Sequence, residues 1–131
     1  MELILKAHLF ISVIAGVLAI SSSAAQQATQ TGPNGGLVAG AASHLIELVI
    51  KEENVSVYSL EAGKAVAVDK AKMRLVVQQE GKSVARELAP AETTRLAARL
   101  DFAPAKGAII VVSGRDNHGH SVSARFVMPD R

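Results

Sequence analysis

The feature that most constrains the fold is an alternation of apolar and polar residues that recurs along most of the chain. In residues 95–102 every second side chain is apolar, from Leu96 to Phe102, and three of the four alternate positions carry a charge. Similar short runs recur roughly every 8–12 residues, separated by turn-forming residues. Because successive side chains of a β-strand point to opposite faces, this period predicts strands with one buried face. We therefore expect an all-β, antiparallel protein.

Seven strands are predicted from this pattern. Their inner faces would form two layers of small aliphatic side chains about 10 Å apart, an antiparallel β-sandwich of immunoglobulin-like architecture. The chain has no cysteine and no tryptophan, which excludes the Cys–Trp–Cys set of antibody domains. A short helix over 89–100 is the alternative at one place, because alanine is a good helix former. The strands are predicted over 44–51, 55–60, 72–79, 83–88, 95–102, 108–113 and 120–128, with a short extended piece over 65–68.

Residues 1–25 have the pattern of a cleavable signal peptide. Leu9 to Ile20 is an uncharged run of about 12 residues, too short to cross a hydrocarbon core of about 30 Å as a helix. Small residues follow, and cleavage after Ala25 would leave Ser23 and Ala25 in the positions where signal peptidase requires small side chains. We expect a signal peptide in 1–25, a flexible lead-in in 26–43 and a β-sandwich domain in 44–131, located in the periplasm or secreted.

Composition argues against several classes of function. Without cysteine the chain has no disulfides, zinc–thiolate sites or cysteine nucleophiles. Aromatic residues make up 3% of the chain and the cations form no block, so nucleic-acid binding is not expected. No nucleophile, base and orienting group can be assembled, so we predict no catalytic residues and no enzyme activity. Beyond the leader no apolar stretch approaches about 18 residues, so no membrane span is expected in the mature chain.

The histidines are candidate metal ligands. His118 and His120 are two residues apart, so their side chains fall on one side of an extended chain. If every connection reverses the chain direction, His44 at the start of the first strand lies at the same end as the turn that carries Asp116, His118 and His120. Imidazole suits Zn, Cu and Ni. We therefore predict a metal site at His44, Asp116, His118 and His120. The alternative is that 116–119 is simply a polar hairpin turn.

Several short motifs carry a resemblance to a known family. The segments 32–36 (Gly-Pro-Asn-Gly-Gly), 44–49, 55–58 and 124–126 resemble small periplasmic β-sandwich modules, which occur alone and as the accessory domain of periplasmic adaptor (membrane fusion) proteins of heavy-metal efflux pumps. The family often has a histidine before the paired glycines, where this chain has Asn34. His44 is then the family-type histidine, and the resemblance implies metal handling beside an efflux system.

Together these observations predict an exported periplasmic binding module that captures or buffers a transition metal, Cu or Zn, in connection with efflux. The expected partner is an efflux or envelope protein. The alternative prediction is a metal-free structural or protein-interaction domain of the cell envelope, which would offer the edge strand of a sheet to its partner.

Overall fold

The computed structural model describes residues 30–41 and 43–130, so the predicted signal peptide in 1–25 lies outside the described residues. The described chain is all-β. Within it there is no helix with the length and hydropathy needed to cross a membrane. Its strands are β1 (Gln30–Thr31), β2 (Leu37–Ala41), β3 (His44–Lys51), β4 (Asn54–Glu61), β5 (Lys64–Val66), β6 (Lys72–Gln79), β7 (Lys82–Glu87), β8 (Ala89–Glu92), β9 (Arg95–Arg99), β10 (Ile109–Arg115) and β11 (Ser121–Val127).

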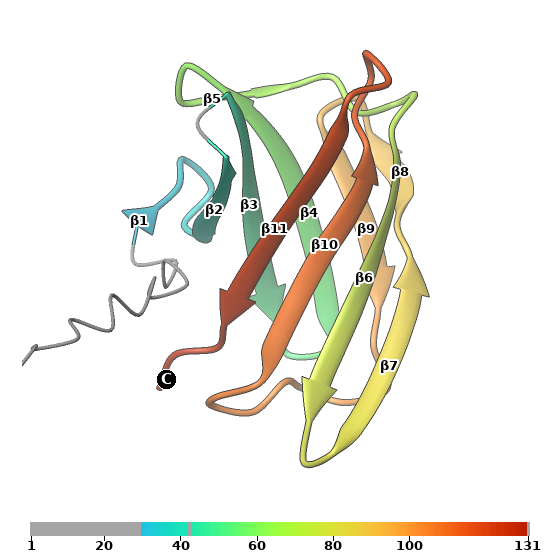
Figure 1. Ribbon diagram of the computed structural model, residues 1–131. Coiled ribbons are helices and arrows are strands. Elements are labelled where there is room, and N and C mark those ends of the chain that lie inside the picture. The colour runs from blue at the N-terminus through green and yellow to red at the C-terminus, as the bar shows by residue number, and fades with distance from the viewer. Residues whose placement is uncertain (1–29, 42, 131) are drawn as a thin grey trace, which may run out of the picture.

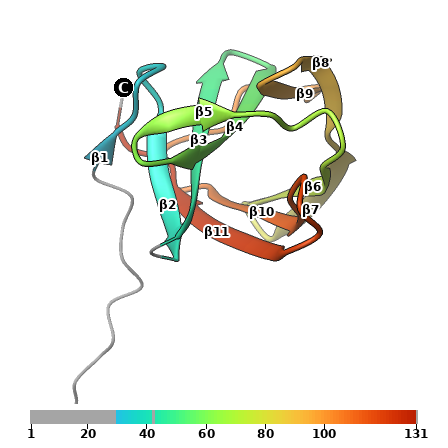
Figure 2. The same ribbon diagram turned by 90° about the horizontal axis from the view of Figure 1, so that it is seen from above.

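Two antiparallel sheets build the molecule (Figure 1). The first has seven strands in the order β1-β2-β3-β4-β9-β8, with β5 paired to β4. The second has four strands in the order β11-β10-β6-β7 and lies in front of the first in Figure 1. Seen from above in Figure 2, the sheets form two layers, and β2 comes close to β11 at one side. This arrangement is compatible with the predicted β-sandwich.

One hydrophobic core fills the space between the sheets. In β6, Met73, Leu75 and Val77 are buried, whereas Arg74 and Gln78 are exposed, as the alternation predicts. The same period in the other long strands turns one apolar face inward from each sheet. Burial of these side chains is the main force that holds the two layers together. The shared core includes Ile46, Leu48, Val55, Val57, Leu96, Ile110, Val112, Val122, Ala124 and Phe126.

All seven predicted strands are present, as β3, β4, β6, β7, β9, β10 and β11. The predicted number of strands is too low, because β1, β2, β5 and β8 add short strands of 2, 5, 3 and 4 residues. The helix considered over 89–100 is wrong. β8 and β9 occupy that segment, and Leu96 is fully buried beside its register partner Val57 on β4. Tertiary pairing therefore overrides the helix propensity of the alanines.

The lead-in expected over 26–43 contains β1 and β2, where the sequence predicted no strand. β2 pairs with β3, and the loop that connects β1 to β2 lies over Glu47, which points to the outer face of β3 and is nevertheless 0% exposed. The loop 32–36 folds over its carboxylate. The backbone amides of Asn34 and Gly36 donate hydrogen bonds to it at 2.9 and 2.8 Å, and the Asn34 side chain donates a third at 2.9 Å. A side chain at Gly32 would overlap this carboxylate. The buried charge therefore fixes the loop.

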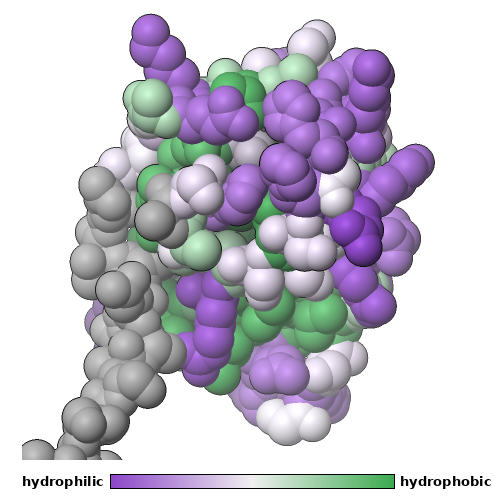
Figure 3. Space-filling view, turned by 45° about the horizontal axis from the view of Figure 1, so that its top comes forward, coloured by the Kyte–Doolittle hydropathy of each residue, from purple (hydrophilic) through white to green (hydrophobic). Residues whose placement is uncertain are grey.

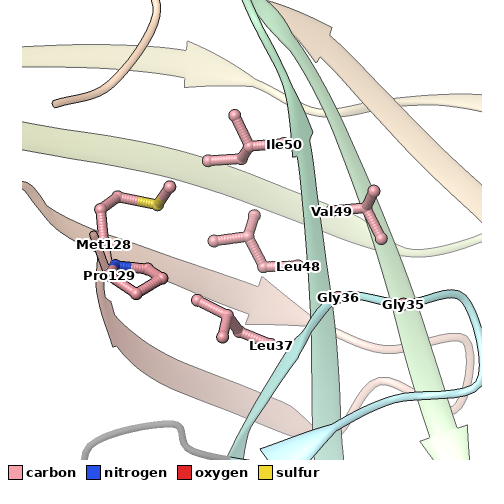
Figure 4. A pocket seen from close by; sticks show the side chains of 8 residues that line it. All are labelled: Gly35, Gly36, Leu37, Leu48, Val49, Ile50, Met128 and Pro129. Carbon is pink, nitrogen blue, oxygen red and sulfur yellow. The ribbon is translucent and has the colours of Figure 1, made fainter. Parts of the chain in front are cut away.

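The two sheets also meet at a corner formed by the ends of β2, β3 and β11. Leu48 and Ile50 face Met128 and Pro129 across a shallow apolar hollow, with Leu37 below them (Figure 4). The hollow has a volume of about 170 Å³. Leu48 and Met128 belong to the core and Leu37 packs against it. The hollow is therefore a gap at the margin of the core.

Candidate metal centre

Three ligand-type side chains lie close together. They come from the start of β3 and from the β10–β11 turn, which lie at the upper end of the molecule in Figure 1. His44 begins β3, Asp116 directly follows β10, and His120 directly precedes β11. The site therefore joins a strand of the first sheet to the β10–β11 hairpin of the second. Figure 3, in which this end comes forward, shows hydrophilic residues gathered over it. Asp116 and His120 share one turn, whereas His44 is distant in sequence and comes beside them because the two sheets stack.

The Asp116 carboxylate lies between the two imidazoles. Its Oδ2 atom is 3.5 Å from Nδ1 of His44 and 3.7 Å from Nδ1 of His120. The two ring centroids are 5.4 Å apart in an edge-to-face arrangement. One ligand atom from each of the three residues lies within 4.8 Å of the other two. Across residues 30–41 and 43–130, no other set of histidine and acidic side chains forms such a group of three.

The two oxygens of Asp116 have different roles. Oδ1 accepts hydrogen bonds from the backbone amides of His118, at 2.9 Å, and His120, at 2.8 Å. An aspartate that binds the amides that follow it is a common way to stabilise a turn. Oδ2 is thereby directed towards the imidazoles of His44 and His120. The turn thus holds one carboxylate oxygen in a fixed position beside both imidazoles.

Further hydrogen bonds hold the turn in place. The amide of Asp116 donates to the carbonyl of His120 at 2.9 Å, and the amide of Gly119 donates to the carbonyl of Asp116 at 3.0 Å. Gly119 has a φ of +77°, a left-handed conformation that glycine adopts without strain. The Asn117 side chain donates to Asp69 at 2.9 Å and so joins this turn to the one before β6. The ligand-bearing turn is therefore preorganised.

The strand that carries His44 is packed closely by its neighbour. In β2, Ala41 is the register partner of His44, and Gly40 precedes it with a φ of +128°. A Cβ atom at Gly40 would overlap the carbonyl oxygen of His44. Glycine at this position therefore lets β2 run beside the first residue of β3. This contact fixes the backbone from which the His44 ring projects.

The charge state of Asp116 suits a ligand. Burial alone raises the pKa of this carboxyl, but the hydrogen bonds from the amides of His120 and His118 act in the opposite direction. Electrostatic interaction with the neighbouring His120 and His44 lowers the pKa of Asp116 further. The net result is that the pKa of Asp116 lies below its ordinary value of 3.8. The residue is therefore ionised at neutral pH, with only 8% of its surface exposed.

The spacing of the three groups suits a small divalent ion. Zinc binds imidazole nitrogen at about 2.0–2.1 Å and carboxylate oxygen at about 2.0–2.2 Å, so tetrahedral ligand atoms lie about 3.4 Å apart. The two Asp116–His distances of 3.5 and 3.7 Å are close to this value. The third separation, between ligand nitrogens of His44 and His120, is no more than 4.8 Å. Two imidazoles and a carboxylate also suit Cu(II).

The structure brings together three of the four predicted ligands. His44, Asp116 and His120 form the group, whereas His118 does not belong to it. The His118 ring is exposed and its centroid lies 6.1 Å from that of His120. Its backbone amide, rather than its ring, contacts Asp116. The two-residue spacing of His118 and His120 in the sequence therefore points to the correct turn, but it does not show which of the two histidines joins the group.

Sequence reasoning missed the role of Glu47 and the loop above it. The alternation places Glu47 on the outer face of β3, where a carboxylate is ordinarily solvated. The one available signal was the motif in 32–36, because its glycines permit the close approach that wraps backbone amides around an acceptor. Nothing in the motif indicates which residue that acceptor is.

Comparisons with known proteins give no assignment: no protein-family model, curated protein or solved structure matches this chain. Its function is therefore argued from the geometry of the site.

Proposed function

We propose that this protein is an exported periplasmic module that binds a transition-metal ion, Cu or Zn, through His44, Asp116 and His120. In this proposal it captures or buffers the ion beside an efflux system. The observation that carries the proposal is the convergence of three ligand-type side chains, from both sheets, with their ligand atoms within 4.8 Å of one another. If residues 116–119 were only a polar hairpin turn, there would be no reason for His44 of the facing sheet to lie beside them.

The openness of the site supports capture or buffering rather than a purely structural role. His44 is about one-third exposed and the side chain of His120 is 62% exposed, whereas Asp116 is buried. Structural zinc sites are ordinarily closed by four protein ligands. Three protein ligands leave a position for water or for a ligand from another molecule. Such a site loads and releases its ion readily.

The order of the long strands supports the immunoglobulin-like architecture that we propose for the domain. If β3, β4, β6, β7, β9, β10 and β11 are lettered A, B, C, C′, E, F and G, the two sheets read A-B-E and G-F-C-C′. Immunoglobulin-like domains group their strands in this way. The pattern of residues 1–25 and the motif resemblance support the proposed export and the proximity to efflux. N-terminal sequencing of protein recovered from a periplasmic fraction tests the export, and we expect it to begin at Gln26.

Isothermal titration of the purified protein with Zn(II) and Cu(II) tests the metal site. We expect one ion per chain and a dissociation constant well below about 1 mM. His44→Ala and His120→Ala each remove a ligand and should weaken binding at least about ten-fold. His118→Ala is the matched control, because it removes an imidazole from the same turn outside the group of three. Equal binding by all three variants, or a constant weaker than about 1 mM, contradicts the proposal.

The second candidate function, a metal-free interaction domain, is favoured by one observation. β7 is the last strand of the four-stranded sheet, and among the residues that the structure describes it is paired only with β6. An edge strand offers unpaired backbone groups to an added strand from a partner. Exposed charged side chains such as Lys82 and Glu87 lie along it and disfavour indiscriminate pairing. If the titration shows no metal binding, a protein-interaction function through this edge strand would be the better proposal.

A further inference from the structure

A hollow of about 380 Å³ lies on the outer face of the seven-stranded sheet, and no part of the metal site contributes to it. Its floor includes Val49 of β3 and Ser56 and Tyr58 of β4. Its walls include Asn34 from the loop 32–36 and Glu92 at the end of β8. The volume falls in the range of about 300–1,000 Å³ that is common for small-molecule sites.

One wall of the hollow is held rigidly. The backbone amide and the side-chain amide nitrogen of Asn34 both donate to the buried Glu47 carboxylate, at 2.9 Å each. Because Glu47 engages the nitrogen, the amide oxygen of Asn34 is the atom left to accept a hydrogen bond from a ligand. The loop 32–36 thus serves the hollow as a fixed wall with an acceptor on it.

A second polar group in the hollow is also preorganised. Arg95 at the start of β9 donates from Nη1 to Ser56 Oγ at 3.4 Å and from Nη2 to Glu92 Oε1 at 3.2 Å. Its side chain is 28% exposed. A guanidinium has five N–H donors in a fixed fork, so donors remain after these two bonds. Arg95 therefore offers oriented donors without a large loss of side-chain entropy on binding.

The lining discriminates between classes of ligand. Lys51 and Arg95 bring positive charge to the lining and Glu92 brings negative charge. An anionic ligand would be repelled by Glu92 and a cationic ligand by Lys51 and Arg95, so the mixed charges favour a neutral ligand. The hollow offers donors and acceptors together, and a hydroxyl group both donates and accepts. Tyr58, the only tyrosine of the chain, adds a half-buried aromatic ring to the floor. An aromatic ring packs well against the apolar C–H face of a sugar ring.

We propose that this outer hollow is a binding site for a neutral carbohydrate, independent of the metal centre at the end of the sheets. Tyr58 provides the surface against which a sugar ring packs. Arg95, Asn34 and Glu92 bind its hydroxyl groups. The site would attach the module to a glycan of its surroundings while the metal centre remains free.

Titration of the isotope-labelled protein with cellotetraose, maltotetraose and chitotetraose, followed by NMR, tests this proposal. We expect saturable amide shifts confined to the hollow, around Asn34, Ser56, Tyr58 and Arg95, with at least one of the three sugars. Tyr58→Ala and Arg95→Gln should each weaken binding at least ten-fold, and Tyr58→Phe should retain most of it. Arg99→Ala is the matched control, because Arg99 lies further along β9 and outside the hollow.

Three outcomes overturn the proposal. One is the absence of saturable shifts with all three sugars up to about 20 mM. Another is unchanged sugar affinity in Arg95→Gln, whatever the folding state of Tyr58→Ala. The third is displacement of the sugar by inorganic phosphate with the same shifts, which would make the hollow an anion site. The His120→Ala variant should bind sugar normally, so failure of the metal site leaves this test unaffected.

Discussion

Replacing Glu47 by glutamine tests whether a buried carboxylate holds the loop 32–36 on the sheet. The change keeps the shape of the side chain but removes its charge and turns one acceptor oxygen into a donor. In the native protein one oxygen accepts from the amide of Gly36 at 2.8 Å and the other from the side chain of Asn34 at 2.9 Å. In the variant one of these donors faces an amide NH₂ group. We expect the loop to loosen and the free energy of unfolding to fall.

The size of the effect follows from burial. Gly36 is buried and water cannot replace a lost acceptor there, whereas Asn34 is exposed and water can. Leaving one buried donor unsatisfied costs about 1–3 kcal/mol, and hydrogen bonds to a charged group are worth about 1.5–3 kcal/mol. Relief of the desolvation of the buried charge offsets part of this loss. We expect a net decrease of about 1–3 kcal/mol, or about 5–20 °C in Tm for a domain of this size.

Urea unfolding followed by circular dichroism measures the change, and hydrogen exchange of the Gly36 amide locates it. Glu87→Gln is the matched control, because Glu87 is exposed on β7 and should alter stability by less than about 0.5 kcal/mol. If Glu47→Gln unfolds within about 0.5 kcal/mol of the parent protein and Gly36 keeps its protection, the carboxylate is not what fixes the loop.

Two further predictions concern the surroundings of the candidate metal centre. Gly114→Ala should lower the free energy of unfolding by more than about 2 kcal/mol in urea, because a Cβ there would overlap the Lys72 carbonyl and φ is +146°. Gly63→Ala is the comparison, because Gly63 has a φ of +77° but nothing within 4 Å of an added Cβ, and it should lower the free energy of unfolding by about 1 kcal/mol. The ionised form of Asp116 stabilises the native state above its ordinary pKa of 3.8, and this contribution disappears as pH falls through the lowered folded-state pKa. Wild type should therefore be more stable than Asp116→Asn at neutral pH and lose that advantage in acid; a constant difference down to the acid transition would contradict this assignment.

The strands were predictable because their signal is local. In β3 and β6 the predicted and observed bounds are the same, His44–Lys51 and Lys72–Gln79. Both strands alternate between an inner and an outer face along their whole length, and this pattern depends only on neighbouring residues. The segment 89–100 was ambiguous because alanine gives a weak local preference. Its pairing with β4 resolved the ambiguity, and that pairing is a contact between distant segments.

The cluster of His44, Asp116 and His120 was predictable in part. Reversal of direction at every turn indicates that His44 shares an end of the molecule with the β10–β11 turn, and the structure places them there. The choice between His118 and His120 was not predictable. It depends on the folded conformation of the turn, in which the His120 ring lies 5.4 Å from the His44 ring and the His118 ring is exposed.

The sequence by itself determined which segments are strands and which of their faces are apolar, because a side-chain period of two is a property of the extended chain. Only the tertiary structure decided what covers the outer face. There the loop 32–36 encloses Glu47, and the same loop forms a wall of the polar hollow over β3 and β4. The physical reason is that the period separates two faces of a strand but contains no information about segments that fold over either of them.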